Sequence, residues 1–98
     1  MAIDPELDAL RRAIDDVDRR LLALIAERVN IVLKVGDYKR QRSLSIYDPE
    51  RERIMIEQLI KLAPQPLNAE IVRRVFERVI DESRRIEQHH SEYPHRSP

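Results

Sequence analysis

Apolar residues recur at alternating steps of three and four along the first part of the chain. Asp4 and Pro5 suit an N-cap and a first helical position, and no proline follows until Pro49. The spacing is typical of a heptad stripe on one helix face. One helix from about Pro5 to Gln41 is therefore predicted, about 55 Å long at the α-helical rise. The stripe consists of Leu7, Leu10, Ile14, Val17, Leu21, Leu24, Ile31 and Val35.

The rest of the chain predicts two shorter helices. The Asp-Pro-Glu segment 48–50 repeats the start signal, and this helix is expected to run to about Leu62, before the breaker Pro-Gln-Pro at 64–66. Asn68 is a good N-cap for a third helix. The apolar positions of that helix are Val72, Val75, Phe76, Val79, Ile80 and Ile86.

The length of the first helix predicts an oligomer. We expect one domain over residues 4–90, followed by a polar, proline-containing and disordered tail over 91–98. A compact domain of this size has a radius of gyration of only about 13 Å. The first helix must therefore project beyond the core and expose its stripe, which a second copy would cover. The predicted fold is all-α: three helices per chain, one very long, in an intertwined homodimeric helical bundle.

Composition excludes several function classes. Lys plus Arg and Asp plus Glu both total 18, so the net charge is zero, unlike that of a nucleic-acid or membrane-surface binder. Gly36 is the single glycine and cysteine is absent, which argues against Gly-rich phosphate loops and thiolate chemistry. No bilayer-spanning run or signal-peptide pattern is present, so a cytoplasmic protein is expected. No metal site is expected from His89, His90 and His95, which lie at the end of the third helix and in the tail.

Several polar residues occupy positions where apolar ones are expected. Arg28 lies on the heptad stripe, and Lys39 lies on nearly the same face. An arginine on a core-facing stripe needs an anionic partner or a water-filled cavity, and the simplest alternative to a site role is a structural ion pair with a Glu or Asp of another helix. Ser83 continues the stripe of the third helix, with Glu87 one turn further on. The alternative for this pair is a core serine bonded to its own helix and a solvated surface glutamate.

The start of the second helix carries Asp48, Arg51 and Glu52 at positions i, i+3 and i+4, either as site residues or as an N-cap and surface charges.

Taken together, the ordered motifs resemble the all-α class of chorismate mutases, including the mutase domains fused to prephenate dehydratase or dehydrogenase. The resemblance covers about residues 4–90. Its segments are Leu-Arg at 10–11, Ile-Asp-Asp-Val-Asp at 14–18, Leu-Ile-Ala-Glu-Arg at 24–28, Val-Gly-Asp-Tyr-Lys at 35–39, Tyr-Asp-Pro-Glu-Arg-Glu-Arg at 47–53 and Ile-Asp-Glu-Ser at 80–83.

The resemblance implies a dimer whose long helices pair antiparallel and whose two sites mix residues of both chains. Arg11 would hold a substrate carboxylate in the other protomer's site, Arg28 would hold the second carboxylate, and Lys39 would bond a carboxylate and the ether oxygen. Arg11 and Arg28 are 17 residues apart on one helix, about 25 Å, too far for one small substrate to bridge within a chain.

The remaining roles also follow from the resemblance. Asp48 and Glu52 would lie near the substrate hydroxyl, Arg51 would be an accessory cation, and Ser83 a carboxylate contact. Glu87 would face the ether oxygen beside Lys39. An ionised carboxylate has only acceptors, so we expect Glu87 to be neutral in the active complex. In addition, Arg84 stands where an apolar residue is common near the site wall.

The implied activity is the pericyclic rearrangement of chorismate to prephenate in aromatic amino acid biosynthesis, an isomerase reaction on the shikimate pathway that needs no cofactor. Two alternatives stay open: an isochorismate pyruvate lyase on the same fold, and a non-catalytic helical dimerisation or regulatory module. The intact pair of Asp48 and Glu52 favours the mutase over the lyase. The inward positions of Arg28, Lys39 and Ser83 favour an enzyme over a structural module.

Overall fold

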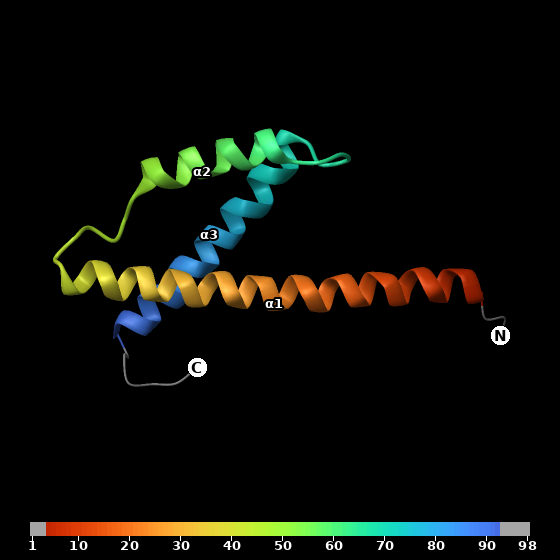
Figure 1. The fold of residues 1–98 in the computed structure, drawn as a ribbon, viewed down its shortest axis with the longest axis horizontal. Coiled ribbons are helices and arrows are strands. Elements are labelled where there is room, and N and C mark those ends of the chain that lie inside the picture. The colour runs from red at the N-terminus through yellow and green to blue at the C-terminus, as the bar shows by residue number, and fades with distance from the viewer. Residues whose placement is uncertain (1–3, 93–98) are drawn as a thin grey trace.

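The computed structural model describes residues 4–92, and within this range the chain forms three α-helices and no strand. Helix α1 spans Pro5–Gln41, α2 spans Pro49–Leu62 and α3 spans Ala69–Glu92. Figure 1 shows α2 above one end of α1, with α3 descending from α2 and crossing α1. Helix α3 contacts both other helices. The predicted all-α class with three helices is therefore confirmed.

The predicted N-caps are also confirmed. The Asp4 carboxylate accepts hydrogen bonds from two backbone N–H groups at 3.0 and 3.1 Å. Asp48 accepts one from the backbone of Arg51 at 3.1 Å, and Asn68 accepts one from the backbone of Ile71 at 2.9 Å. Each cap satisfies a donor that has no partner within its helix. Local sequence therefore fixes where each helix begins.

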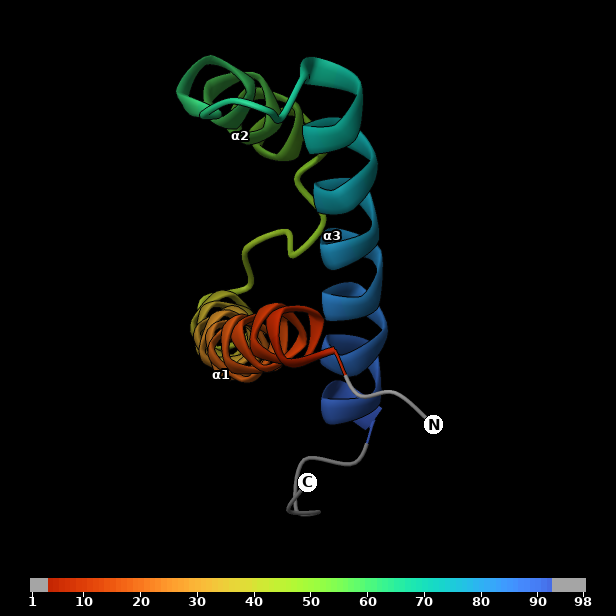
Figure 2. The same ribbon diagram turned by 90° about the vertical axis from the view of Figure 1, so that its right-hand side faces the viewer.

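The core within one chain is small. Among the described residues, the buried apolar side chains are Ile56, Val72 and Ile80, on the faces where α2 and α3 meet and where α3 approaches α1. Viewed along α1, the molecule is a thin layer in which α3 links two helices that lie far apart (Figure 2). Its extents are 61 × 34 × 16 Å and its radius of gyration is 17.7 Å. A compact domain of this length would measure about 13 Å.

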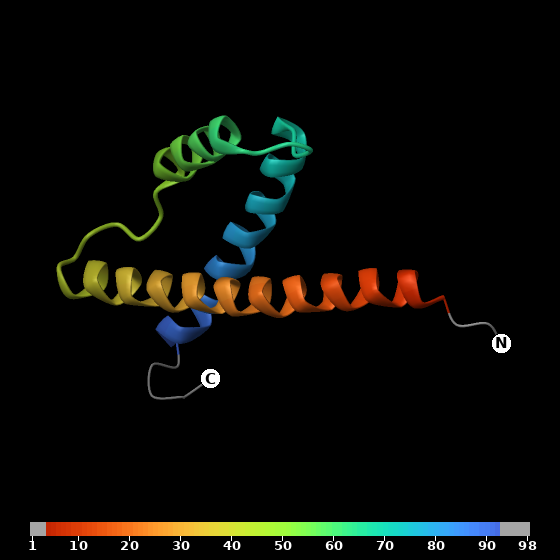
Figure 3. The ribbon, with the colours of Figure 1, turned by 45° about the vertical axis from the view of Figure 1, so that its right-hand side comes forward.

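The N-terminal half of α1 extends away from the other helices (Figure 3). Its apolar stripe is exposed, which agrees with the predicted surplus of uncovered apolar surface. No helix in residues 4–92 is long and apolar enough to cross a membrane. The exposed stripe residues of this half are Leu7, Leu10, Ile14, Val17, Leu21 and Leu24.

The C-terminal boundary differs from the prediction. A disordered tail was expected over 91–98, but Ser91 and Glu92 belong to α3. The next helix-breaking residue is Pro94, so nothing in the sequence stops the helix at position 90. The rest of the expected tail, 93–98, lies outside the described residues.

Candidate active site

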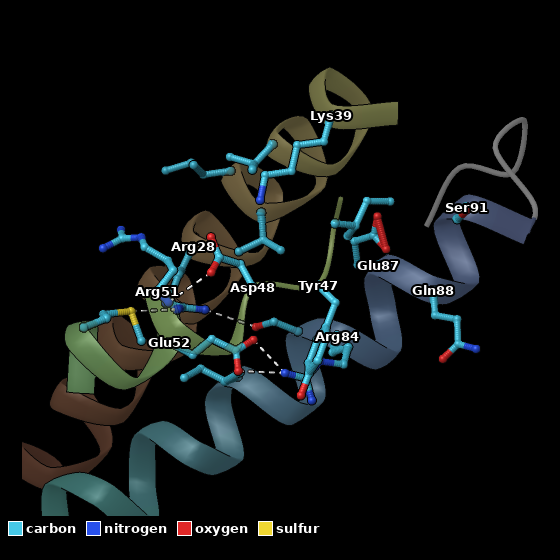
Figure 4. Close-up of a pocket in the computed structure, with 17 residues that line it drawn as sticks. Arg28, Lys39, Tyr47, Asp48, Arg51, Glu52, Arg84, Glu87, Gln88 and Ser91 are labelled. Carbon is cyan, nitrogen blue, oxygen red and sulfur yellow. Dashed lines mark hydrogen bonds and ion pairs between the residues drawn. The ribbon is translucent and has the colours of Figure 1, made fainter. Parts of the chain in front are cut away.

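A cleft of about 720 Å³ opens between α1, the connection that precedes α2, and helices α2 and α3. Figure 4 shows labelled side chains from all four of these segments around it. Apart from Arg11, all of the predicted site residues line this cleft. They are Arg28, Lys39, Asp48, Arg51, Glu52, Ser83 and Glu87.

Arg11 lies elsewhere in the single chain. It is exposed in the N-terminal half of α1, and it is not among the residues that line the cleft. The helical rise separates it from Arg28 by about 25 Å. One chain alone therefore does not bring Arg11 to the other predicted site residues.

The α1 side of the cleft is one helix face. Arg28, Val32, Val35 and Lys39 follow one another at steps of three and four, so their side chains point the same way. The cations thus stand among aliphatic side chains, as in pockets for small polar ligands. The apolar walls are contributed by Ile31, Val32, Val35, Ile46, Met55 and Ile80.

Arg28 bonds neutral groups in this structure. Its Nη1 donates to Ser83 Oγ at 3.3 Å and its Nη2 to Met55 Sδ at 3.6 Å. Ser83 Oγ in turn donates to the backbone oxygen of Val79 at 2.6 Å, so its lone pairs stay available to Arg28. Ser83 is therefore both a serine bonded to its own helix and a cleft residue. Within residues 4–92, Arg28 has no ion pair, so the predicted alternative of a structural ion pair is wrong for the described chain.

Lys39 is the second half-buried cation of this face. Its side-chain ammonium makes no hydrogen bond or ion pair with any residue in the described range, although its backbone oxygen accepts from Arg42 and Leu44. Burying an uncompensated charge is unfavourable, whereas an anion bound between Arg28 and Lys39 would compensate both. The electrostatics of the cleft therefore fit an anionic ligand. In the part of the chain that the structure describes, no cluster of His, Cys, Asp or Glu could hold a metal ion.

The opposite wall contains an ion pair between helices. Arg84 Nη2 donates to both carboxylate oxygens of Glu52, at 2.6 and 2.8 Å. This hydrogen bond to Glu52 raises the pKa of Arg84 above its usual value. The Arg84 guanidinium also lies over the Tyr47 ring, 5.2 Å from its centre. Asp48 acts as the N-cap of α2 and still lines the cleft, so its two interpretations are compatible.

Glu87 is buried, with 7% of its surface exposed, so the alternative of a solvated surface glutamate is wrong. Its side chain packs on Gly36 of α1, where an added Cβ would stand 3.1 Å from Glu87 Cδ. One carboxylate oxygen accepts a hydrogen bond from Arg40 Nη1. Arg40 also donates to Asp37 at 2.6 Å. These contacts with Glu87 and then Asp37 raise the pKa of Arg40.

Two interactions of this site have no signal in the sequence. Arg40 and Glu87 are 47 residues apart, and Glu52 and Arg84 are 32 apart, each pair on different helices. Only the i, i+3 spacing of Asp37 and Arg40 is visible locally. Arg40 was therefore absent from the predicted set.

Comparison with known proteins gives consistent matches. A family model described as chorismate mutase type II matches residues 10–88. The chorismate mutase of Methanocaldococcus jannaschii is 30% identical over 88 residues, which cover 89% of this chain and 89% of that protein. The T-protein of Enterobacter agglomerans is 44% identical over 76 residues, which cover 72% of this chain and 20% of that protein. The chain spans about a fifth of the length of this T-protein and of the bifunctional relatives that it matches.

Solved structures agree with the sequence matches. A structure of chorismate mutase (form II) from Thermus thermophilus has a TM-score of 0.82 at 32% identity, covering 85% of this chain and 94% of that one. A chorismate mutase from Helicobacter pylori, crystallised in complex with prephenate, has a TM-score of 0.81 at 31% identity, covering 88% and 93%. Sequence and fold thus lead to the same result. The chain belongs to the chorismate mutase type II family.

Proposed function

We propose that this chain catalyses the rearrangement of chorismate to prephenate, as a homodimer with shared active sites. The observation that carries the proposal is the pair of half-buried cations, Arg28 and Lys39, which have no carboxylate partner in the described chain. Chorismate is a dianion with apolar ring surface, and the cleft offers cations between aliphatic walls. The related Helicobacter pylori enzyme was crystallised in complex with prephenate, the product of this reaction.

The reaction is a one-substrate pericyclic shift, in which the ether C–O bond breaks as a new C–C bond forms. Catalysis consists of holding the dianion in a compact, chair-like conformer and stabilising negative charge on the ether oxygen. The planar guanidinium of Arg28 suits a carboxylate, which it can bind through two hydrogen bonds. The concentrated charge of Lys39 suits both a carboxylate and the ether oxygen.

The wall of α2 and α3 would hold the remaining polar groups of the substrate. Asp48 and Glu52 would accept from its hydroxyl group, since ionised carboxylates are acceptors. Ser83 would contact a carboxylate, and Arg51 would add positive charge at the entrance. All four line the same cleft as Lys39, which supports these assignments.

The homodimer explains the exposed half of α1. If two copies of α1 pair antiparallel, Arg11 of the partner subunit comes close to Arg28, which a single chain cannot achieve over about 25 Å. The same pairing covers the exposed apolar stripe. Arg11 would then bind the second substrate carboxylate across the interface.

Glu87 would face the ether oxygen beside Lys39. That oxygen gains negative charge in the transition state, so it requires a hydrogen-bond donor. A neutral carboxyl group can donate, whereas an ionised one only accepts and would repel the developing charge. Glu87 would therefore act in its neutral form.

A substrate assay tests the proposed function. The purified chain is incubated separately with chorismate and with isochorismate, with the Arg28→Ala variant as a control. We expect wild type to convert chorismate to prephenate and to leave isochorismate intact. Release of pyruvate from isochorismate would assign the lyase activity instead. If the protein is folded and dimeric but converts neither substrate, the result would favour the non-catalytic dimerisation or regulatory module.

A further inference from the structure

The carboxylate of Glu87 has its ionic partner outside the cleft wall. Arg40 binds it from α1, although Arg40 itself is not among the residues that line the cleft. The two groups are largely shielded from water, with 28% of the Arg40 side chain and 10% of the Glu87 side chain exposed. Screening by solvent and salt is weak for such a pair. Arg40 is therefore a shielded cationic partner of Glu87.

The guanidinium of Arg40 also binds a second carboxylate, that of Asp37. Asp37 accepts from Arg40 Nη2 at 2.6 Å, one helical turn earlier on α1. His90 of α3 places Nε2 3.3 Å from the Asp37 carboxylate. The pKa of Asp37 is lowered by its bond to Arg40 and then by His90, so Asp37 stays ionised and keeps Arg40 in place. The bond to Glu87 thus belongs to a fixed set of contacts between α1 and α3.

This geometry conflicts with what the proposed chemistry requires. Glu87 can donate to the ether oxygen only when neutral, whereas its contact with Arg40 suits the ionised form. The bound dianion acts in the opposite direction, because it disfavours a further negative charge nearby. The other titratable or charged groups around Glu87 are Lys39 and Asp37 on α1, Arg84 and His90 on α3, Tyr47 and Asp48 before α2, and Arg51 and Glu52 on α2.

We propose that Arg40 is a positioning residue that sets the pH range of catalysis by holding Glu87 ionised against Gly36 until substrate binds. This inference rests on the proposed mutase function. Substrate binding shifts Glu87 to its neutral form, with uptake of one proton from solvent. The ion pair opposes that uptake, so activity falls at a lower pH than it would without Arg40.

The pH dependence of kcat/KM tests this role. Arg40→Met removes the charge and keeps a side chain of similar length. We therefore expect the alkaline limb of the profile, where kcat/KM falls as the pH rises, to move to higher pH by about one unit or more. Arg40→Lys should stay closer to wild type because it keeps the charge. Arg42→Met is the matched control, because exposed Arg42 lies over Tyr38 and not on Glu87. Superimposable profiles for Arg40→Met and wild type would overturn the inference.

A double variant separates the action of Arg40 from a general structural effect. Glu87→Gln always offers a donor, so its profile should lack the alkaline limb. If Arg40 acts through Glu87, adding Arg40→Met to Glu87→Gln should leave that flat profile unchanged. A further change of profile in the double variant would mean that Arg40 acts by another route.

Proton uptake on ligand binding provides a test that needs no catalysis. Prephenate is titrated into wild type by calorimetry, in two buffers of different ionisation enthalpy, at a pH above the alkaline limb. We expect uptake of about one proton per site for wild type and clearly less for Arg40→Met. Binding to wild type without uptake overturns the inference even if Arg40→Met fails to fold. If wild type binds prephenate with proton uptake but does not convert chorismate, the proposed function is contradicted. The link between ligand binding and protonation of Glu87 is then still supported.

Discussion

The two halves of α1 carry one apolar repeat but have different surroundings. In the N-terminal half, Leu10 is 62% exposed and Leu24 is 60% exposed. In the C-terminal half, the same stripe lines the cleft, and Gly36 packs against Glu87 of α3. The difference teaches that a heptad pattern predicts which surface must be covered but not which chain covers it.

Covering the exposed stripe in the N-terminal half of α1 would contribute a large free energy of association. Burying one Leu, Ile or Val side chain contributes about 1.5–3 kcal/mol. Stable interfaces bury about 1,200–2,000 Å² in total, which a helix half with an exposed apolar stripe can supply together with its partner. In the proposed dimer, the N-terminal half of one α1 lies against the C-terminal half of the other. Each half would then contribute what the other lacks: Arg11 from one and Arg28 from the other.

The largest effect is expected from a charge within the exposed stripe. Leu21→Glu would place a carboxylate in the proposed interface without a partner, which strongly destabilises association. We expect sedimentation to give the monomer mass, and mutase activity to fall by about a thousandfold or more, because both proposed shared sites would be lost. Ala23→Glu adds the same charge outside the stripe and should stay dimeric and active. A dimeric, active Leu21→Glu variant would contradict the proposed pairing.

The next effect concerns the two arginines that stand in different halves. Arg28→Ala and Arg11→Ala should each lower kcat/KM by about two to three orders of magnitude without unfolding the protein. Mixing the two inactive variants should restore part of the activity, because a hybrid dimer contains one site with both arginines. The matched control is Arg12→Ala, which should behave like wild type. If subunits exchange and no activity returns, Arg11 does not act across the interface.

The fold was predictable because its determinants are local. The caps at Asp4, Asp48 and Asn68 and the heptad stripe depend on residues within one or two helical turns, and all three caps form as expected. The positions of Arg28 and Lys39 in the cleft were predictable for the same reason, since each stands on a helix face whose other members are apolar.

The ion pairs of the site were not predictable from the sequence. Glu52 meets Arg84, and Glu87 meets Arg40, only because α3 crosses the chain at one particular angle. That crossing is set by packing between helices, which periodicity within one helix does not encode. The partners of Glu87 therefore had to come from the structure.

A smaller effect is expected at the wall of the cleft formed by α2 and α3. Arg84→Met removes the contact with Glu52 but no group assigned to the substrate carboxylates. Because Arg84 is half exposed, its ion pair contributes at most about 1 kcal/mol. We expect a change of less than about tenfold in KM, measured by steady-state kinetics against Arg85→Met, which alters an exposed arginine outside the cleft. A loss as large as that of Arg28→Ala would make Arg84 a substrate ligand.

The smallest effect is expected for acid stability. Arg40 and then His90 lower the pKa of Asp37 below its usual 3.8, so Asp37 stabilises the fold above that pH. This contribution is lost as the pH falls through the lowered pKa of the folded state. Asp37→Asn should therefore unfold at lower urea concentration than wild type at neutral pH, and the two midpoints should converge in strong acid. Asp15→Asn, on the exposed half of α1, is the control. A difference that persists unchanged in acid would contradict the role of the ion pair.

The single glycine of the chain has a consequence for engineering. Replacing Gly36 by alanine would favour the helical state of α1 by about 1 kcal/mol, and selection for heat resistance alone would favour that change. The new methyl group would occupy the space where Glu87 packs, at 3.1 Å from its Cδ. Thermal robustness and reactivity therefore make opposite demands on this position. A stabilised version of this protein should gain its stability elsewhere, for example on the polar face of α1.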